Sequence, residues 1–262
     1  MADITFQDIK KAYHTQASSS NVTLCYSGKT VKVRQIKMKD KKEFLKYLEK
    51  DDDELIDSCI DSLIERYVTS EDGDPIDARK LVDKERHQLL MKIRTLSSNQ
   101  EEAEIDHICP KCEEISTIKF PLNTIEVINY KKPDGYDDVI TSKNGGVRFK
   151  IGNLTRENVV DIEKYIKDKN LDTDVEKEFV YLAGTIKEIY VNIDDVSSSK
   201  FVPSVIECVE FLENVSFDDF DKVKNYFANT KDYGLNLKIN FTCKCGYKNE
   251  KEEVKIADFF TK

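Results

Sequence analysis

The 262-residue sequence contains only three histidines, His14, His87 and His107, and none of its serines lies in a GxSxG motif. Acid–base and nucleophilic catalysis commonly depend on such residues. The stretch "SGKT" at 27–30 imitates the end of a phosphate-binding loop. That loop requires a glycine where this chain has Thr23, and a helix where a strand is predicted. We therefore predict no catalytic residues and expect that the protein is not an enzyme.

Long apolar runs and an excess of basic residues are also missing. No window reaches the roughly 18 apolar residues of a membrane span, and the opening "MADITFQDIKK" lacks the apolar stretch of a signal peptide. Fifty acidic residues outnumber 41 basic ones, which gives a formal net charge of −9. General binding to nucleic acid needs clustered Lys and Arg. We expect no membrane span, no nucleic-acid site and no small-molecule substrate, with synthesis in a reducing cytoplasm.

The hydrophobic pattern predicts an α+β chain. A β-hairpin is predicted around "YSGK", where Gly28 allows a tight turn. Apolar residues at helical spacing then predict three helices, the first at 39–50, the second around 55–68 and the third at 78–97. Later patterns predict a helix that continues through Ile186 and Ile189, a helix with Pro203 in its first turn, and a capping box at Ser216 and Asp219.

Two cysteine pairs lie in segments of matching layout. "HICPKCEEISTIKF" and "NFTCKCGYKNEKEEVKI" each contain an apolar strand, a turn with two cysteines and a second strand. Two such hairpins form a zinc ribbon, in which four thiolates surround one ion. We predict Cys109, Cys112, Cys243 and Cys245 as the ligands, with His107 in reserve. The alternatives are inert cysteine pairs or a disulfide. Cys25, Cys59 and Cys208 lie in apolar patterns and are predicted to be buried.

Four thiolates close the coordination shell, so the zinc is expected to be structural and not catalytic. The ion would hold together two segments that are far apart in the sequence. The predicted organisation is an N-terminal segment at 1–19, a β-hairpin plus helical domain at 20–103, a zinc-ribbon-like antiparallel β domain at 104–154 and 235–262, and a helical insertion at 155–234.

Several segments occur in one characteristic order: "SGKTVKVRQIKMKDKKEFL", "LLMKIRTLS", "CPKC", "CKCG" and the closing "IADFF". In this order the chain resembles the baseplate protein family of T-even-type contractile-tailed phages, the group with the small hub and hub-assembly proteins. The resemblance implies a non-enzymatic structural component or assembly factor of the baseplate hub. It also implies other tail baseplate or hub proteins as partners, and a location in the virion tail and, during assembly, in the host bacterial cytoplasm.

The alternative is a zinc-ribbon protein of transcription or RNA metabolism. Such a protein would carry basic and aromatic residues on its ribbon. Here Glu113 and Glu114 lie on the first hairpin, while the second mixes three lysines with three glutamates, namely Lys244, Lys248, Lys251, Glu250, Glu252 and Glu253. The charges cancel, which favours the baseplate interpretation.

Overall fold

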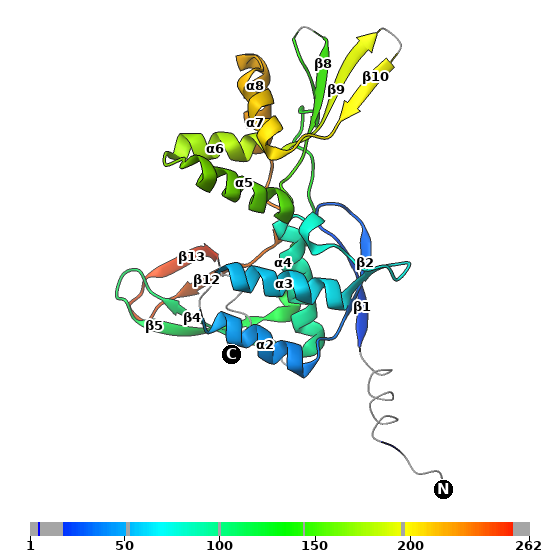
Figure 1. Cartoon of the computed structure of the whole chain (residues 1–262). Coiled ribbons are helices and arrows are strands. Elements are labelled where there is room, and N and C mark those ends of the chain that lie inside the picture. Colours follow the sequence, from blue (N-terminus) through cyan, green and yellow to red (C-terminus); the bar gives the residue numbers. More distant parts are fainter. Residues whose placement is uncertain are drawn as a thin grey trace. The chain divides into compact units, whose positions relative to one another are not determined.

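The computed structural model describes residues 5, 18–50, 53–98, 101–143, 145–194 and 197–253. The chain forms two compact units. Unit 1 comprises residues up to Ala78, Lys84–Asn129 and the chain from Tyr233 onward, and unit 2 comprises Arg79–Asp83 and Tyr130–Asp232. Most of unit 2 is therefore inserted into unit 1. Helices and antiparallel strands occur in both units (Figure 1), which confirms the predicted α+β class.

Unit 1 contains a three-stranded sheet of order β1-β2-β3, three helices and three two-stranded ribbons among its described residues. Its elements are β1 (Ser19–Thr23), β2 (Thr30–Arg34), α2 (Met38–Leu48), α3 (Asp53–Tyr67), β3 (Val68–Ser70), α4 (Asp83–Ser97), β4 (Glu102–Ile108), β5 (Ile115–Pro121), η2 (Leu122–Thr124), β6 (Val127–Ile128), β11 (Gly234–Leu235), β12 (Lys238–Thr242) and β13 (Lys248–Glu253).

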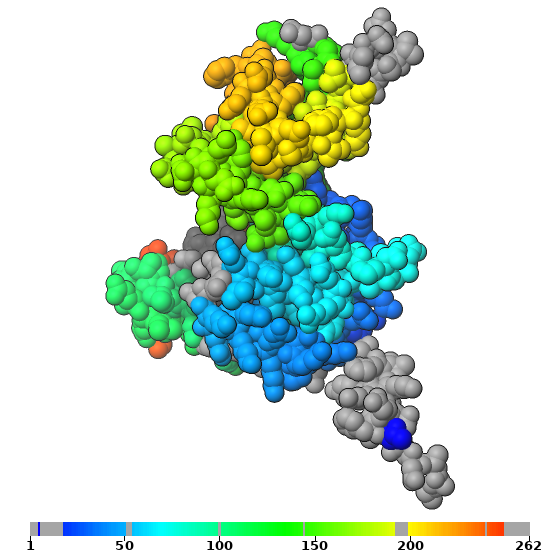
Figure 2. Space-filling view, in the orientation of Figure 1, coloured from blue at the N-terminus to red at the C-terminus, as the bar shows by residue number. Residues whose placement is uncertain are grey.

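The N-terminal hairpin and the first two helices lie where the sequence predicts them. Gly28 adopts a φ of 68° in the turn between β1 and β2, a conformation that glycine takes without steric cost. The α3 stripe of Ile60, Leu63 and Ile64 is buried, as its helical spacing predicts. In Figure 2 the side chains of α2 and α3, in blue to cyan, form one continuous surface.

The third helix begins later than predicted. The segment at 78–80 is a separate 3₁₀ turn, η1 (Ala78–Lys80), and α4 begins at Asp83. Between them the chain pairs with the residues at the start of α5: Leu81 O accepts a hydrogen bond from Arg156 N at 3.0 Å, and Val82 forms a β-bridge with Thr155. These backbone groups are used in pairing within unit 2. They are therefore not available to an earlier turn of the helix.

α4 is the central helix of unit 1. Leu89, Leu90 and Ile93 are fully buried, as apolar spacing predicts. Arg86 is 1% exposed, and its guanidinium contacts Asp61 Oδ1 at 2.7 Å and Asp57 Oδ1 at 3.3 Å on α3. A buried guanidinium is tolerated only when such partners neutralise it. This ion-pair network therefore fixes α4 against α3.

Unit 2 has a four-stranded antiparallel sheet of order β10-β9-β8-β7, with four helices among its described residues. Its elements are β7 (Val139–Thr141), β8 (Val147–Ile151), α5 (Arg156–Lys169), α6 (Asp174–Ala183), β9 (Ile186–Asp194), β10 (Ser197–Phe201), α7 (Val205–Glu213) and α8 (Phe217–Ala228). Sheet and helices share one core, in which Phe149, Ile162 and Val223 are 0% exposed.

Two local predictions for this unit are wrong. Ile186 and Ile189 belong to strand β9 and do not continue a helix, because α6 ends at Ala183 and β9 then pairs with β8 and β10. Pro203 precedes the helix: Ser204 is the N-cap of α7 and forms a capping box with Glu207. Strands β7 and β8, which the sequence assigns to the ribbon domain, pair within the unit 2 sheet. The inserted unit is therefore mixed and not purely helical.

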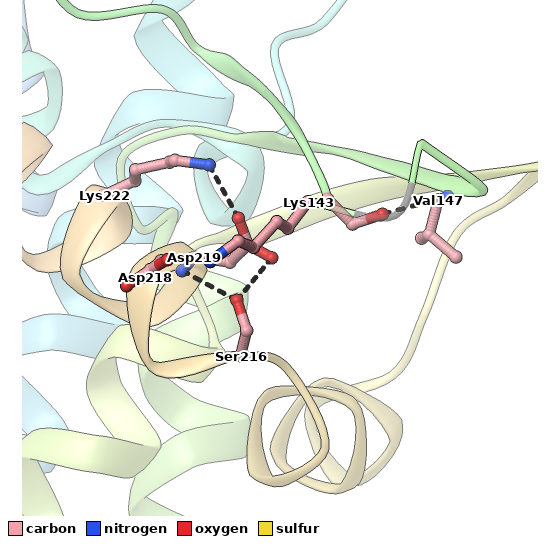
Figure 3. A network of polar contacts seen from close by, with 7 residues as sticks. Lys143, Val147, Ser216, Asp218, Asp219 and Lys222 are labelled. Carbon is pink, nitrogen blue, oxygen red and sulfur yellow. Dashed lines mark hydrogen bonds and ion pairs between the residues drawn. The ribbon is translucent and has the colours of Figure 1, made fainter.

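The start of α8 is joined to the turn between β7 and β8 by two neighbouring carboxylates, Asp218 through the Lys143 ammonium and Asp219 through the Lys143 backbone N–H (Figure 3). Asp219 accepts hydrogen bonds from Ser216 Oγ at 2.8 Å and from Lys222 Nζ at 2.7 Å. Asp219 N also donates to Ser216 Oγ. The neighbouring Asp218 forms an ion pair with Lys143 at 3.0 Å. Ser216 is thus the N-cap of α8, as predicted, but the Asp219 carboxylate accepts from the Ser216 hydroxyl and not from Ser216 N, so only the first half of the predicted capping box is present.

The chain leaves unit 1 and returns to it at adjacent positions. β6 and β11 pair antiparallel, with Ile128 opposite Gly234 and Val127 opposite Leu235. Asn236 N continues the ladder with a hydrogen bond to Glu126 O at 2.9 Å. This short ribbon, in unit 1, joins both ends of the insertion. In the sequence, one cysteine hairpin precedes the inserted residues and the other follows them.

Candidate metal centre

Each cysteine pair occupies the turn of an antiparallel hairpin, as the sequence predicts. β4 and β5 pair without a register shift from Glu102 opposite Pro121 to Ile108 opposite Ile115. β12 and β13 pair from Lys238 opposite Glu253 to Thr242 opposite Lys248, with one bulge. The last pair of each ladder directly precedes and follows its turn. The strands therefore fix where the cysteine turns begin and end.

The two turns close in the same way although one is a residue shorter. In the first, Cys109 N donates to Glu114 O, and Glu113 N donates to Cys109 O. In the second, Cys243 N donates to Tyr247 O, and Gly246 N donates to Cys243 O. The residue after the second cysteine is left-handed in both turns, with φ of 59° at Glu113 and 83° at Gly246. "CKCG" is therefore the structural equivalent of "CPKC" with its following glutamate.

The four thiols of the two turns gather into one cluster. Cys109 Sγ lies 3.9 Å from Cys245 Sγ, and Cys112 Sγ lies 3.6 Å from Cys243 Sγ. All four sulfurs lie within 4.8 Å of one another. A tetrahedron with Zn–S bonds of about 2.3 Å has sulfur–sulfur edges of about 3.8 Å. None of the cysteines forms a disulfide, so the spacing fits metal coordination and not a covalent bond.

The hydrogen bonds around Cys109 favour its thiolate. Desolvation opposes ionisation, but the N–H groups of Lys111 and Cys112 and the thiols of Cys112 and Cys243 outweigh it, and the pKa of Cys109 falls to about 7. For Cys112, the N–H of Glu114 lowers the pKa, yet the neighbouring thiols and desolvation raise it to about 12. The isolated cluster thus favours one thiolate. A divalent cation would supply the charge that permits the others to ionise.

The reserve ligand predicted from the sequence lies outside this cluster. His107 is not among the residues whose ligand atoms come together. Its ring packs edge-on against Phe241, with ring centroids 4.8 Å apart. His107 lies on β4 and Phe241 on β12, so this contact joins the two hairpins by packing. The sequence gives no signal for this role, because it depends on two hairpins meeting.

The donor set is suited to structure and not to activation of water. Four sulfurs at these distances fill a tetrahedral shell and leave no position for a substrate or a water molecule. Cys109 and Cys243 are buried, and Cys112 and Cys245 are exposed. Across the cluster, Lys244 Nζ contacts Glu114 Oε1 at 3.1 Å. This exposed ion pair adds little stability, but it offsets charge at the ribbon surface.

The remaining cysteines are buried, as predicted. Cys25 and Cys208 are each 2% exposed and Cys59 is 9% exposed. Desolvation by burial raises the pKa of each of these thiols to about 11, which leaves them protonated and unreactive at neutral pH.

Among the helices that the structure describes, none has the length and apolar composition needed to span a membrane.

The model of a family described as "T4 bacteriophage base plate protein" matches residues 18–261, which is nearly the whole chain. No curated protein and no solved structure matches the sequence.

Proposed function

Because the chain belongs to the T4 bacteriophage base plate protein family, we propose that it is a non-enzymatic structural component or assembly factor of the baseplate hub of a contractile phage tail. We further propose that Cys109, Cys112, Cys243 and Cys245 hold one structural zinc ion. Its partners are other tail baseplate or hub proteins. It works in the virion tail, and it is made and assembled in the cytoplasm of the host bacterium.

The sulfur geometry is the observation that supports the zinc ion most directly. The two close sulfur pairs join residues 136 and 131 positions apart in the sequence. Their distances match the edges of a tetrahedral thiolate shell. Cysteines that only fill space have no reason to converge from two hairpins with equivalent turns. The backbone N–H groups directed at Cys109 further support an anionic sulfur.

A structural zinc ion explains how an inserted unit can have defined ends. Zinc binding in finger peptides contributes roughly 10–16 kcal/mol, which is comparable with the whole free energy of unfolding of a domain, roughly 5–15 kcal/mol. The ion would hold the hairpins before and after the insertion together, next to the β6–β11 ribbon. An assembly protein gains from this a chain of fixed geometry on which binding surfaces are preorganised.

The metal is tested by elemental analysis of the purified chain. We expect one zinc ion per chain in the wild type and loss of zinc in Cys112→Ser. Lys111→Ser is the matched control, because it makes the same replacement in the same turn at an exposed residue that supplies no sulfur. A wild-type chain purified without chelators that contains no zinc would refute the metal assignment.

The biological role is tested in the phage that encodes the chain. Deletion of the gene is expected to stop baseplate formation, as seen by electron microscopy, and the wild-type chain supplied from a plasmid is expected to restore it. Affinity capture from infected cells should recover tail baseplate proteins. If the chain instead retains specific DNA or RNA at physiological salt and captures no tail protein, the alternative of a zinc-ribbon protein of transcription or RNA metabolism is correct.

A further inference from the structure

Strand β1 forms one edge of the unit 1 sheet, and it faces a hollow of about 730 Å³. We call this hollow the β1 groove. It is lined by Asn21–Thr23 of β1, by Gln88, Met91 and Thr95 on one face of α4, and by Leu122, Ile125 and Val127 on the facing segment. Its volume lies in the range of ligand clefts, roughly 300–1,000 Å³.

At every second residue of β1, the backbone N–H and C=O groups are directed into this groove. Leu24 N donates to Lys29 O, and Ser18 O accepts from Gln35 N, so the backbone N–H and C=O groups of residues 18 and 24 are directed toward β2. Because these groups alternate in direction along a strand, the backbone N–H and C=O groups of residues 19, 21 and 23 are directed away from β2, toward the groove. Thr23 O confirms this direction, because it accepts a hydrogen bond from Gln88 Nε2 at 2.9 Å.

At one end of this edge, the side chain of Gln88 already forms the hydrogen bonds that a partner strand would form. Its side-chain amide donates to Thr23 O and accepts from Cys25 N at 2.9 Å, and a neighbouring strand would make the same pair of contacts. Nearer the start of β1, neither Asn21 N nor Thr23 N donates a hydrogen bond to any described residue. These N–H groups are available to an incoming strand.

The edge also lacks the features that normally prevent strand addition. Sheet edges are usually protected by Pro, by charged residues or by bulges. β1 reads Ser-Ser-Asn-Val-Thr and pairs with β2 without a register shift. The opposite edge of the same sheet is closed, because Pro75 bridges Thr69 of β3 and Ser70 N donates to Asp74 O. Among the residues that the structure describes, one edge of this sheet is therefore left open, and it borders an apolar-floored groove.

We propose that the β1 groove binds an extended segment of another tail baseplate protein, which adds as a fourth strand beside β1. The segment's carbonyl groups accept from Asn21 N and Thr23 N, and its N–H groups donate to Ser19 O and to Asn21 O, which Ser20 Oγ also contacts at 3.3 Å; Thr23 O stays with Gln88. Its alternate side chains pack on Met91 and Leu122, which are 4% and 6% exposed at the groove floor. Lys92 and Glu101 contribute one charge of each sign to the lining. The segment is therefore uncharged, with apolar residues at every second position.

This inference rests on the proposed function, because the partner is taken from the tail. The probe is a set of overlapping synthetic peptides of about 12 residues, longer than a typical strand, that covers the other baseplate proteins of the same phage. Binding to the full chain is measured by fluorescence anisotropy. We expect at least one peptide to bind and to lose binding when its backbone is N-methylated at alternate residues, because methylation removes the donors to β1.

The protein variants isolate the strand edge. Asn21→Pro removes the outward N–H while edge strands tolerate proline, and we expect at least tenfold weaker binding. Asn21→Ala keeps the N–H and should change affinity less than threefold. Thr95→Arg fills the groove from α4 and should abolish binding. Circular dichroism of each variant verifies folding, and the N-methylated peptides test the same contact in an unaltered protein.

Two failures are distinguishable. If the wild type captures tail proteins from infected cells but no peptide binds, or binding is unaffected by Asn21→Pro, Thr95→Arg and N-methylation, the groove proposal is wrong and the function stands. If the wild type captures no tail protein, the proposed function fails with it.

Discussion

Cys109 Sγ lies 3.9 Å from Cys245 Sγ although 136 residues separate the two in the sequence. The intervening chain includes all of the residues Tyr130–Asp232 of unit 2. The contact therefore closes a long loop, and the entropy of loop closure must be repaid by what holds the sulfurs together. The predictions below test this closure first, and then the packing and charges of the inserted unit.

Loss of one ligand should loosen both hairpins and not only its own. In Cys112→Ser we expect faster amide hydrogen exchange in β12–β13 as well as in β4–β5, because the ion joins the two turns. Lys111→Ser should leave both protected. Exchange that increases in β4–β5 alone would show that the hairpins are stabilised independently.

The left-handed residue of the second turn should require glycine. Gly246 has a φ of 83°, and a side chain there costs roughly 1–2 kcal/mol. We expect Gly246→Ala to lower the free energy of unfolding by about that amount in urea titrations. Glu113→Ala is the matched control, since Glu113 already carries a side chain at the equivalent position. Equal effects of the two substitutions would contradict the equivalence of the turns.

Gly184 should be intolerant of a methyl group for a steric reason alone. Its φ of −62° suits alanine, but a Cβ would lie 2.4 Å from Ile162 Cδ1, and Ile162 is 0% exposed. We expect Gly184→Ala to cost about 1–3 kcal/mol of stability. Gly146→Ala, with nothing within 4 Å of its added Cβ, should be nearly neutral.

The steric explanation can be checked by removing the obstructing atom. Ile162→Val deletes Cδ1, so the double variant Gly184→Ala/Ile162→Val should be more stable than the sum of the single effects predicts. Strict additivity in thermal unfolding would exclude this clash as the cause.

Lys187 should reduce stability at neutral pH. Desolvation by burial lowers its pKa to about 8. Its Nζ donates hydrogen bonds to Asn158 Oδ1 and Gly184 O, which are amide oxygens and carry no formal charge. Because the folded pKa lies below the unfolded value of roughly 10.4, the unfolded state binds more protons between these values. This residue's contribution to stability therefore increases as pH rises from about 8 toward 10.4.

We expect Lys187→Met to raise the free energy of unfolding at pH 7 by about 1–3 kcal/mol, and to raise it less at pH 10. Lys164→Met, at an exposed residue of α5, should change it little at either pH. A gain from Lys187→Met that is the same at both pH values would argue against desolvation of the ammonium.

Asp219 should contribute stability in the opposite pH direction. Desolvation raises its pKa, but hydrogen bonds from Lys222, Ser216 and the backbone N–H of Lys143 outweigh this effect and hold the pKa below its ordinary value. The stabilisation is therefore complete above the unfolded pKa of roughly 3.9 and is lost as pH falls through the lower folded pKa. It acts where α8 meets the β7–β8 turn (Figure 3).

We expect Asp219→Asn to cost about 1–3 kcal/mol at pH 7, as for a hydrogen-bonded buried charge, and progressively less in acid. Asp218→Asn removes an exposed ion pair with Lys143 and should cost less than about 1 kcal/mol. Similar losses for both variants at pH 7 would mean that burial of Asp219 is not what matters.

Local chemistry allowed much of this protein to be predicted from its sequence. Residues near one another in the chain define the N-terminal hairpin, the stripe of α3, the cap at Ser216 and both cysteine turns. Capping, glycine conformation and hydrophobic period act over a few residues, so they are visible without coordinates. The resemblance to a baseplate family likewise depends on the order of local segments, and the family match over residues 18–261 confirms it.

The tertiary structure decided which segments pair. Ile186 and Ile189 have helical spacing with α6, yet they form a strand because β8 and β10 flank them. Hydrogen-bond partners of a strand lie far away in the sequence, so no local pattern specifies them. For the same reason, only the fold excludes His107 from the sulfur cluster, leaves the β1 edge open beside α4, and brings four thiols from two distant hairpins to the spacing of a tetrahedron.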